Sequence, residues 1–180
     1  MEYTRDCINY TGGFFMKKVL LSLTVLTALS TATAMAAPIN NLAANETAVG
    51  LGTNESYIEH KINDDITLGY QYADRDEYGH MHDVYGQIDM ISNVKGIVGH
   101  RDNLPQDNSN FYAGLAVSTP RVMGAEGYAS YITGADFNET QVGVNMNVVA
   151  NVDLNINYHN FDADHGSREN GVGIGATMKF

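Results

Sequence analysis

The chain ends in the stretch GVGIGATMKF, residues 171–180, and the order of residue types in this stretch decides the fold. In an extended strand, successive side chains point to opposite faces. One face of this strand is apolar and consists of Val172, Ile174, Ala176, Met178 and Phe180. The other face carries only glycine, threonine and lysine. The alternation predicts a β-strand whose apolar face continues to the last residue of the chain.

The same period of two recurs along most of the chain after residue 37, and no stretch there keeps apolar residues at helical spacing. We therefore predict an all-β protein. Its clearest strands are residues 66–73, 82–90, 94–101, 111–118, 141–148, 152–159 and 171–180. Weaker candidates are residues 47–53, 56–62 and 127–134.

The connections between these strands alternate in length. Tight turns are expected at residues 63–65, 91–93 and 149–151, with residues 119–126 as a longer connection on the same side. Long polar loops are expected on the other side, at residues 74–81, 102–110, 134–139 and 162–169. This alternation predicts an antiparallel up-and-down arrangement with turns at one end of the sheet and loops at the other.

The register of each tight hairpin follows from its two faces, because residues paired across antiparallel strands point to the same side. Three-residue loops place apolar residues opposite apolar residues in all three hairpins. In the hairpin around residues 91–93, this register places Asp89 opposite Lys95 and Asp83 opposite Arg101 on the polar face. A two-residue loop would pair apolar with polar faces.

Two features indicate that the polar face is enclosed and the apolar face points outward to lipid. Most strand glycines lie on the polar face, where a narrow barrel interior needs small residues. Charges on this face are also balanced, as an enclosed lumen requires because an unpaired buried charge is costly. The predicted lumen charge network consists of Glu59, Lys61, Asp83, Asp89, Lys95, Arg101, Asp153 and Lys179.

The alternating strands, the turn pattern and the terminal outward Phe180 resemble the small outer-membrane β-barrel proteins of diderm bacteria, the OmpX, OmpA-barrel and YfaZ-like group. The resemblance implies that Phe180 is part of the signal read by the barrel-assembly machinery. It also implies girdles of aromatic side chains at both ends of the barrel. The candidates are Tyr72, Phe111, Tyr158 and Phe161 at the loop end, with Tyr128 and Phe180 at the turn end.

The N-terminal part of the chain has the pattern of an export signal. Two lysines precede an apolar run over residues 19–29, which is followed by small residues ending in Ala34-Met35-Ala36. We predict a mis-called start over residues 1–15, a signal peptide over 16–36 cleaved after Ala36, a periplasmic lead-in over 37–46 and the barrel over 47–180. The expected location is the bacterial outer membrane.

The number of strands must be even if both termini of the chain lie on the same side of the membrane. Nine strands run from residue 56 to the end, so residues 47–53 are needed as a tenth. An eight-stranded barrel remains the alternative, if residues 127–134 and one neighbouring strand do not pair in this way.

The expected function is structural or surface-interactive, without catalysis, cofactor or metal, and with a largely filled lumen that includes Tyr85 and Tyr112. Expected partners are outer-membrane lipid and lipopolysaccharide, together with the barrel-assembly machinery. The formal net charge of −11 excludes nucleic acid as a plausible partner.

Acidic residues crowd the predicted loops, where only Arg75 and Arg168 offset them, so divalent cations at this rim are a further candidate partner. The acidic residues are Glu55, Asp74, Asp76, Glu77, Asp102, Asp107, Asp136, Glu139, Asp162, Asp164 and Glu169.

Three alternatives stay open. The first is a narrow, cation-preferring channel. The second is an outer-membrane hydrolase or acyltransferase using Ser167 with His165, or His159 with Asp153. The third is a soluble periplasmic barrel that binds an apolar ligand. A histidine–carboxylate metal site could also be built from His80 and His82 together with Asp162, Asp164 and His165 in another loop.

Overall fold

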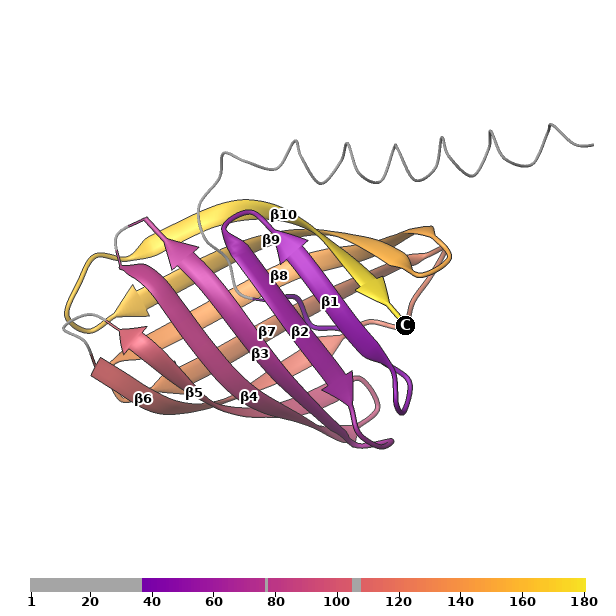
Figure 1. The fold of residues 1–180 in the computed structure, drawn as a ribbon, viewed down its shortest axis with the longest axis horizontal. Coiled ribbons are helices and arrows are strands. Elements are labelled where there is room, and N and C mark those ends of the chain that lie inside the picture. Colours follow the sequence, from indigo (N-terminus) through magenta and orange to yellow (C-terminus); the bar gives the residue numbers. More distant parts are fainter. Residues whose placement is uncertain (1–36, 77, 105–107) are drawn as a thin grey trace, which may run out of the picture.

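Ten antiparallel strands form one closed barrel, as Figure 1 shows. The computed structural model describes residues 37–76, 78–104 and 108–180, so the expected mis-called start and signal peptide lie outside the described residues. The strands are β1 (Thr47–Gly52), β2 (Glu55–Lys61), β3 (Ile66–Arg75), β4 (Gly79–Ile91), β5 (Val94–Leu104), β6 (Asn108–Ser118), β7 (Ala125–Gly134), β8 (Phe137–Val149), β9 (Val152–Ala163) and β10 (Glu169–Lys179).

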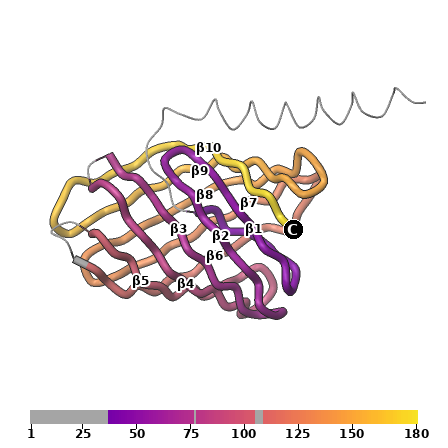
Figure 2. The backbone as a smooth tube through the Cα atoms, in the orientation of Figure 1, coloured from indigo at the N-terminus to yellow at the C-terminus, as the bar shows by residue number. Residues whose placement is uncertain are grey.

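Each strand pairs with its neighbours in the sequence, and β1 pairs with β10 to close the circuit, which can be followed along the tube in Figure 2. Val49 lies opposite Met178 across this seam, and the backbone amides of Thr47 and Phe180 each donate to the carbonyl of the other residue. The prediction of a ten-stranded up-and-down barrel is therefore confirmed, and the eight-stranded alternative is wrong. No helix in the described part of the chain is long and apolar enough to cross a membrane.

The predicted hairpin registers are confirmed along the strands. Asp89 lies opposite Lys95 and Asp83 opposite Arg101 in the β4–β5 hairpin. The turns themselves are one residue tighter at two places, because a bulge near Met90 in β4 and another near Val148 in β8 absorb the extra residue. Each bulge leaves one residue unpaired beside the turn without changing the face of the residues beyond it.

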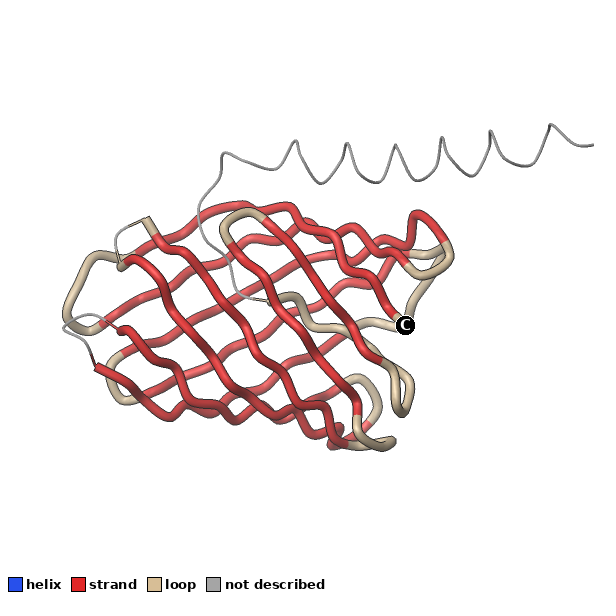
Figure 3. Tube along the Cα trace, in the orientation of Figure 1, coloured by secondary structure: helices blue, strands red, loops and turns tan. Residues whose placement is uncertain are grey.

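The predicted difference between short turns and long loops is wrong. We call the end of the barrel that holds connections 62–65, 92–93, 119–124 and 150–151 the turn end, and the opposite end the loop end. Connections at the loop end span only residues 53–54, 76–78, 105–107, 135–136 and 164–168, and Figure 3 shows how far the strands extend toward this end. Polar residues there continue the ladder, because backbone hydrogen bonds do not require apolar side chains.

The outer surface of the barrel is apolar over its middle, and its interior is polar. Many large apolar side chains of the strands point outward and keep between 37 and 80% of their surface exposed. Glutamates, glutamines, asparagines and arginines of the same strands are almost fully buried in the lumen. This is the reverse of a soluble barrel and fits the predicted facing of the strands.

Glycines on the inner face make room for tyrosine rings from the neighbouring strand. Gly69 lies opposite Tyr85, and Gly99 lies opposite Tyr112. A Cβ atom added at either glycine would overlap the facing ring. The same arrangement occurs where Gly50 meets Tyr57 and where Gly143 meets Tyr128. These pairs explain why glycine gathers on the face that encloses the lumen.

Candidate functional site

The lumen is the candidate functional site, because the buried polar and charged side chains of the strands converge there. All eight residues of the predicted charge network point inward. Six of them are almost fully buried, while Asp89 and Lys179 lie nearer the mouth, with 31 and 12% of their side chains exposed. Seven of the eight charges belong to three groups, one at the loop end and two at the turn end, and Glu59 lies between them.

The first turn-end group is a lysine–carboxylate–lysine triad. Asp89 on β4 accepts hydrogen bonds from Lys61 on β2 at 2.5 Å and from Lys95 on β5 at 2.8 Å. One carboxylate thus joins two strands that are not neighbours in the sheet. The hairpin register brings Asp89 to Lys95, whereas the contact with Lys61 spans the intervening strand β3 and depends on the curvature of the sheet.

The second turn-end group is centred on Asp153 of β9. Its carboxylate accepts from Arg121 at 2.8 Å and from Lys179 at 3.0 Å. Arg121 comes from the 119–124 connection, folds back toward the lumen and also contacts Glu126 at 3.2 Å. Hydrogen bonds to Asp153 raise the pKa of Arg121 above its ordinary value. The arginine thereby closes part of the turn end.

The loop-end network is the most deeply buried group of charges. Arg101 on β5 donates from Nε and Nη2 to both oxygens of Asp83, at 2.7 and 2.6 Å. Its Nη1 donates to Glu139 at 2.7 Å, and Glu139 also accepts from Arg75 at 2.7 Å. Arg75 lies 3.7 Å from Glu169 in addition. Strands β3, β4, β5, β8 and β10 are therefore linked across the lumen.

Aromatic rings pack against these two arginines. The Arg75 guanidinium carbon lies 4.3 Å from the centre of the Phe161 ring, and that of Arg101 lies 4.6 Å from the centre of the Phe137 ring. Both phenylalanines are buried, and Tyr112 packs edge-on against Phe137. Cation–π contacts of this kind strengthen as water is excluded, so the rings stabilise the guanidinium groups and seal the loop end.

Glu59 occupies the middle of the lumen without a lysine or arginine within ion-pair distance among the described contacts. Its carboxylate accepts hydrogen bonds from Tyr85 at 2.9 Å, from Gln87 at 2.8 Å and from Asn40 at 2.8 Å. Neutral donors therefore satisfy this carboxylate. Asn40 belongs to the segment before β1.

Residues 37–42 lie inside the barrel, which differs from the expected periplasmic lead-in over residues 37–46. Ile39, Asn40 and Leu42 are buried, and the carbonyl of Ile39 accepts from Asn145 at 2.9 Å. In Figure 3 this segment passes behind the near strands. The polar backbone of an extended segment finds hydrogen-bond partners in a polar lumen, and the sequence contained no separate signal for that placement.

Several lumen residues were assigned to the solvated loops from the sequence, and that assignment is wrong. Arg75, Glu55, Glu139 and Glu169 are buried inside. They lie on strands that extend further than expected, and each occupies an inward-facing position in the alternation of its strand. Glu139 follows the parity of Gln141, for example. Continuing the alternation into the polar segments would have found them.

Phe161 and Tyr128 are also placed differently from the predicted girdles. Both are buried in the lumen. Phe111 and Phe180 point outward, with 80 and 63% of their surface exposed, and Tyr158 is also exposed. Tyr128 lies opposite Gly143 of β8, on the inner face of the sheet.

Free space in the described part of the barrel includes a hollow of about 270 Å³ at the turn end, beside Asn41, Asp89 and Lys95, and a smaller cavity deeper in the lumen. A cavity of about 40 Å³ is lined by Asp83, Gln87, Arg101, Glu139 and residues around them, including Ala37. This volume holds a few water molecules, whereas pockets for small organic ligands have volumes of about 300 to 1,000 Å³. The arrangement fits a packed interior.

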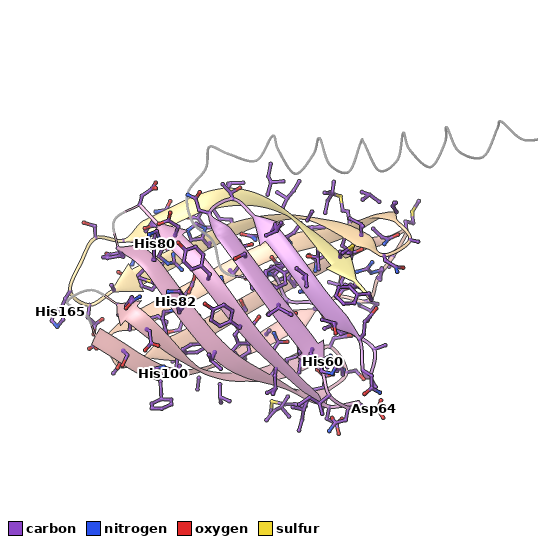
Figure 4. The ribbon with its side chains drawn as sticks, viewed as in Figure 1. His60, Asp64, His80, His82, His100 and His165 are labelled. Carbon is purple, nitrogen blue, oxygen red and sulfur yellow. The ribbon has the colours of Figure 1, made fainter. Side chains whose placement is uncertain are left out.

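The outer surface near the loop end carries a band of tyrosines and histidines, of which Figure 4 labels His80, His82 and His100. Tyr70 hydrogen-bonds with His82 at 2.8 Å, and Tyr72 with His80 at 2.6 Å. His100 packs edge-on against Phe111. The band supplies amphipathic side chains in a chain that has no tryptophan.

The structure does not bring the other candidate sites together. Among the described residues no group of three or more histidine, cysteine, aspartate or glutamate side chains is arranged to hold a metal ion. His159 lies 4.0 Å from Glu169, and it is six residues from Asp153 on one strand, which corresponds to roughly 20 Å. His165 and Ser167 are exposed, and no hydrogen bond joins them among the contacts of the described loop.

Comparison with known proteins gives only distant structural likenesses. No protein-family model matches the chain, and no curated protein matches its sequence. The N-terminal β-barrel domain of Pseudomonas aeruginosa OprF aligns with 77% of this chain and all of its own, at 10% identity and a TM-score of 0.41. A designed transmembrane β-barrel aligns with 79% of this chain and all of its own, at 15% identity and a TM-score of 0.39. Neisserial surface protein A aligns with 75% of this chain and 94% of its own, at 16% identity and a TM-score of 0.31. At these TM-scores, function has to be argued from the barrel itself.

Proposed function

We propose that this protein is an integral outer-membrane β-barrel with a filled lumen and a structural or surface-interactive role, and that it is not an enzyme. One observation carries the proposal. Apolar side chains cover the outside of a closed barrel, while arginines, glutamates and asparagines are buried within it. Such a surface is stable in hydrocarbon and would aggregate in water.

The expected export signal and the outward-facing Phe180 support delivery to the outer membrane by the barrel-assembly machinery. Phe180 ends the strand that closes the barrel, and its side chain is exposed. Outer-membrane lipid is then the direct partner of the apolar surface. The tyrosine–histidine band would lie at the lipid headgroups, where amphipathic side chains are favoured. Lipopolysaccharide would contact the loop end.

The lumen supports a role that does not depend on conduction. Arginines, carboxylates and aromatic rings close the loop end, residues 37–42 run into the lumen from the turn end, and the cavity that Ala37 lines between them has a volume of about 40 Å³. A hydrated ion needs a continuous polar passage. Folded protein in a planar bilayer should therefore give no stable unitary conductance.

Two further tests address the membrane location. The folded protein should stay with the membrane pellet after a carbonate wash, and its gel mobility should change on heating, as expected for a barrel that resists detergent until it is heated. Folded protein recovered from a periplasmic extract without detergent would contradict the proposal and favour the soluble ligand-binding alternative.

A narrow cation-preferring channel is the second candidate, because carboxylates exceed cationic side chains in the described lumen. Unitary currents that favour cations would support it against the filled-lumen proposal. Divalent cations at the loop rim remain a related proposal, with Asp74, Asp102, Asp136 and Asp162 as acidic residues at that end. Loss of a calcium-induced thermal shift after their replacement by asparagine would test it.

A further inference from the structure

Residues 37–42, which we call the plug segment, make specific contacts on several strands. Asn40 donates to Glu59 at 2.8 Å and to the Tyr57 hydroxyl at 3.2 Å on β2, and Asn145 on β8 donates to the Ile39 carbonyl at 2.9 Å. The segment is thus tied to opposite sides of the barrel. Its side chains at 39, 40 and 42 are almost fully buried.

The turn-end half of the plug segment is tied to the charges around the mouth. Asn41 hydrogen-bonds with Glu126 and with the Ser118 hydroxyl, the latter at 3.2 Å. Lys179 donates to the Asn41 carbonyl at 3.4 Å. Asn45, just outside the plug segment, donates its amide to the Lys61 carbonyl at 2.7 Å. The chain therefore enters the lumen from the turn end, where β1 begins.

The first residue of the plug segment lies beside charged groups of the loop-end network. Ala37 lines the small cavity together with Asp83, Glu139 and Arg101, which pairs with both carboxylates, and Gln87 also lines it. Gln87 is buried, and its Oε1 atom has no hydrogen-bond partner among the described residues. A buried acceptor of this kind is costly unless a donor reaches it. The cavity thus contains an acceptor that a new donor could satisfy.

Among the described residues, the lumen holds more carboxylates than cationic side chains. Eight carboxylate side chains reach it, from Glu55, Glu59, Asp83, Asp89, Glu126, Glu139, Asp153 and Glu169. Six cationic side chains face them, from Lys61, Arg75, Lys95, Arg101, Arg121 and Lys179. An enclosed space of low dielectric penalises such an excess, so a further cation would stabilise it.

We propose that cleavage after Ala36 creates a cation for the lumen. The new α-amino group of Ala37 would be protonated at neutral pH, since the ordinary pKa of this group is about 8. It would lie in the cavity beside Asp83 and Glu139 and donate to Gln87. Signal-peptide removal then completes the interior of the barrel as well as releasing the chain. The proposal rests on the export signal of the proposed function, but its test does not require a membrane.

The location of the plug segment can be tested with residues 37–180, which contain all ten strands, refolded in detergent micelles. The α-amine is labelled with an amine-reactive ester near pH 6.5, where lysines are protonated, and the N-terminal peptide is analysed by mass spectrometry. Labelling of the folded chain should be on the order of 100-fold slower than of the unfolded chain, because reaction requires local opening. A chain beginning at Ala43, which is exposed, should be labelled at similar rates in both states.

A second measurement does not depend on that truncated chain. The chain 37–180 has no cysteine, so Ile39→Cys and Ala44→Cys each introduce a single thiol, one buried and one exposed. Cysteine at position 39 should resist a polar thiol reagent in the folded barrel, and cysteine at 44 should react. Reaction of both thiols at equal rates would overturn the buried plug segment.

The role of the charge is tested by acetylating the α-amine while the chain is unfolded and then refolding it. Acetylation should lower the unfolding temperature by about 5 °C or more, and the same modification of the chain beginning at Ala43 should leave it unchanged. An acetylated chain as stable as the free one would overturn the proposed cation. So would protein isolated from cells with an N-terminal residue other than Ala37. Recovery from the periplasm without detergent would overturn the membrane role while leaving both labelling results valid.

Discussion

Replacing Arg101 with methionine should strongly destabilise the barrel. The change removes three short hydrogen bonds to two buried carboxylates and keeps an apolar chain of similar length. Among the described contacts, Glu139 keeps Arg75, but Asp83 keeps only the Tyr112 hydroxyl at 3.3 Å. Asp83 would become a buried carboxylate without a cation.

The size of the effect follows from that loss. Removing one partner of a buried ion pair costs about 3–5 kcal/mol, because the other charge stays out of water. Both Arg101 and Asp83 have 5% or less of their side chains exposed, so solvent screening is small. We therefore expect the free energy of unfolding to fall by about 3–5 kcal/mol.

Urea unfolding in detergent micelles, followed by circular dichroism, measures this change. Arg168→Met is the matched control, because the Nη2 atom of Arg168 lies 2.6 Å from Asp162, the same distance as that between Arg101 and Asp83. The Arg168 pair is exposed at the loop end, so its loss should leave the urea midpoint unchanged. Burial is the main difference between the two pairs.

A double variant separates charge from packing. Arg101→Met with Asp83→Asn removes both charges of the closest pair and should recover at least half of the stability lost in the single variant, because removing both partners is often nearly neutral. The reasoning would be refuted if Arg101→Met and Arg168→Met had the same midpoint. The lumen charges would then be solvated rather than enclosed.

Three further substitutions, one with a matched control, test other parts of the barrel. Asp89→Ala should lower stability by about 1–2 kcal/mol in thermal unfolding, less than a fully buried pair, because its carboxylate is partly exposed; an unchanged transition would contradict its bridge between two lysines. Gly99→Ala should cost about 1–3 kcal/mol by overlap with the Tyr112 ring, whereas Gly86→Ala, whose nearest contact would be 3.7 Å away, should have no effect on the urea midpoint. Val98→Arg should lower the free energy of unfolding in lipid vesicles by about 2–4 kcal/mol, because position 98 faces the hydrocarbon. Equal stability of this variant and the unmodified protein in the vesicles would contradict the outward-facing apolar surface.

Strand direction, and the facing of the most regular strands, were predictable from the sequence, because a period of two places every second side chain on the same face. The polar side of β8 shows this clearly. Gln141, Gly143 and Asn145 share one face, and all three are buried. The same alternation contained the correct placement of Glu139. It was missed because the surrounding residues are polar on both faces and were interpreted as a loop.

Such a pattern could not predict the contacts across the lumen. The pairing of Asp89 with Lys95 follows from one hairpin, whereas the ion pair between Asp89 and Lys61 joins β4 to β2. Similarly, Arg101 reaches Glu139 from β5 to β8, and Arg121 folds back from a connection to Asp153. These distances depend on how the closed sheet curves and on the length of each side chain.

By itself, the sequence determined that this chain forms an antiparallel barrel, for which parity favoured ten strands over eight, and which residues face inward along its most regular strands. These properties follow from local alternation and from the parity of the strands. The tertiary structure alone decided which charges meet across the lumen, how completely the rings of Phe137 and Phe161 seal one end, and that residues 37–42 fill the other. Closure brings side chains together from strands that are distant in the sequence, and no local period encodes which of them will meet.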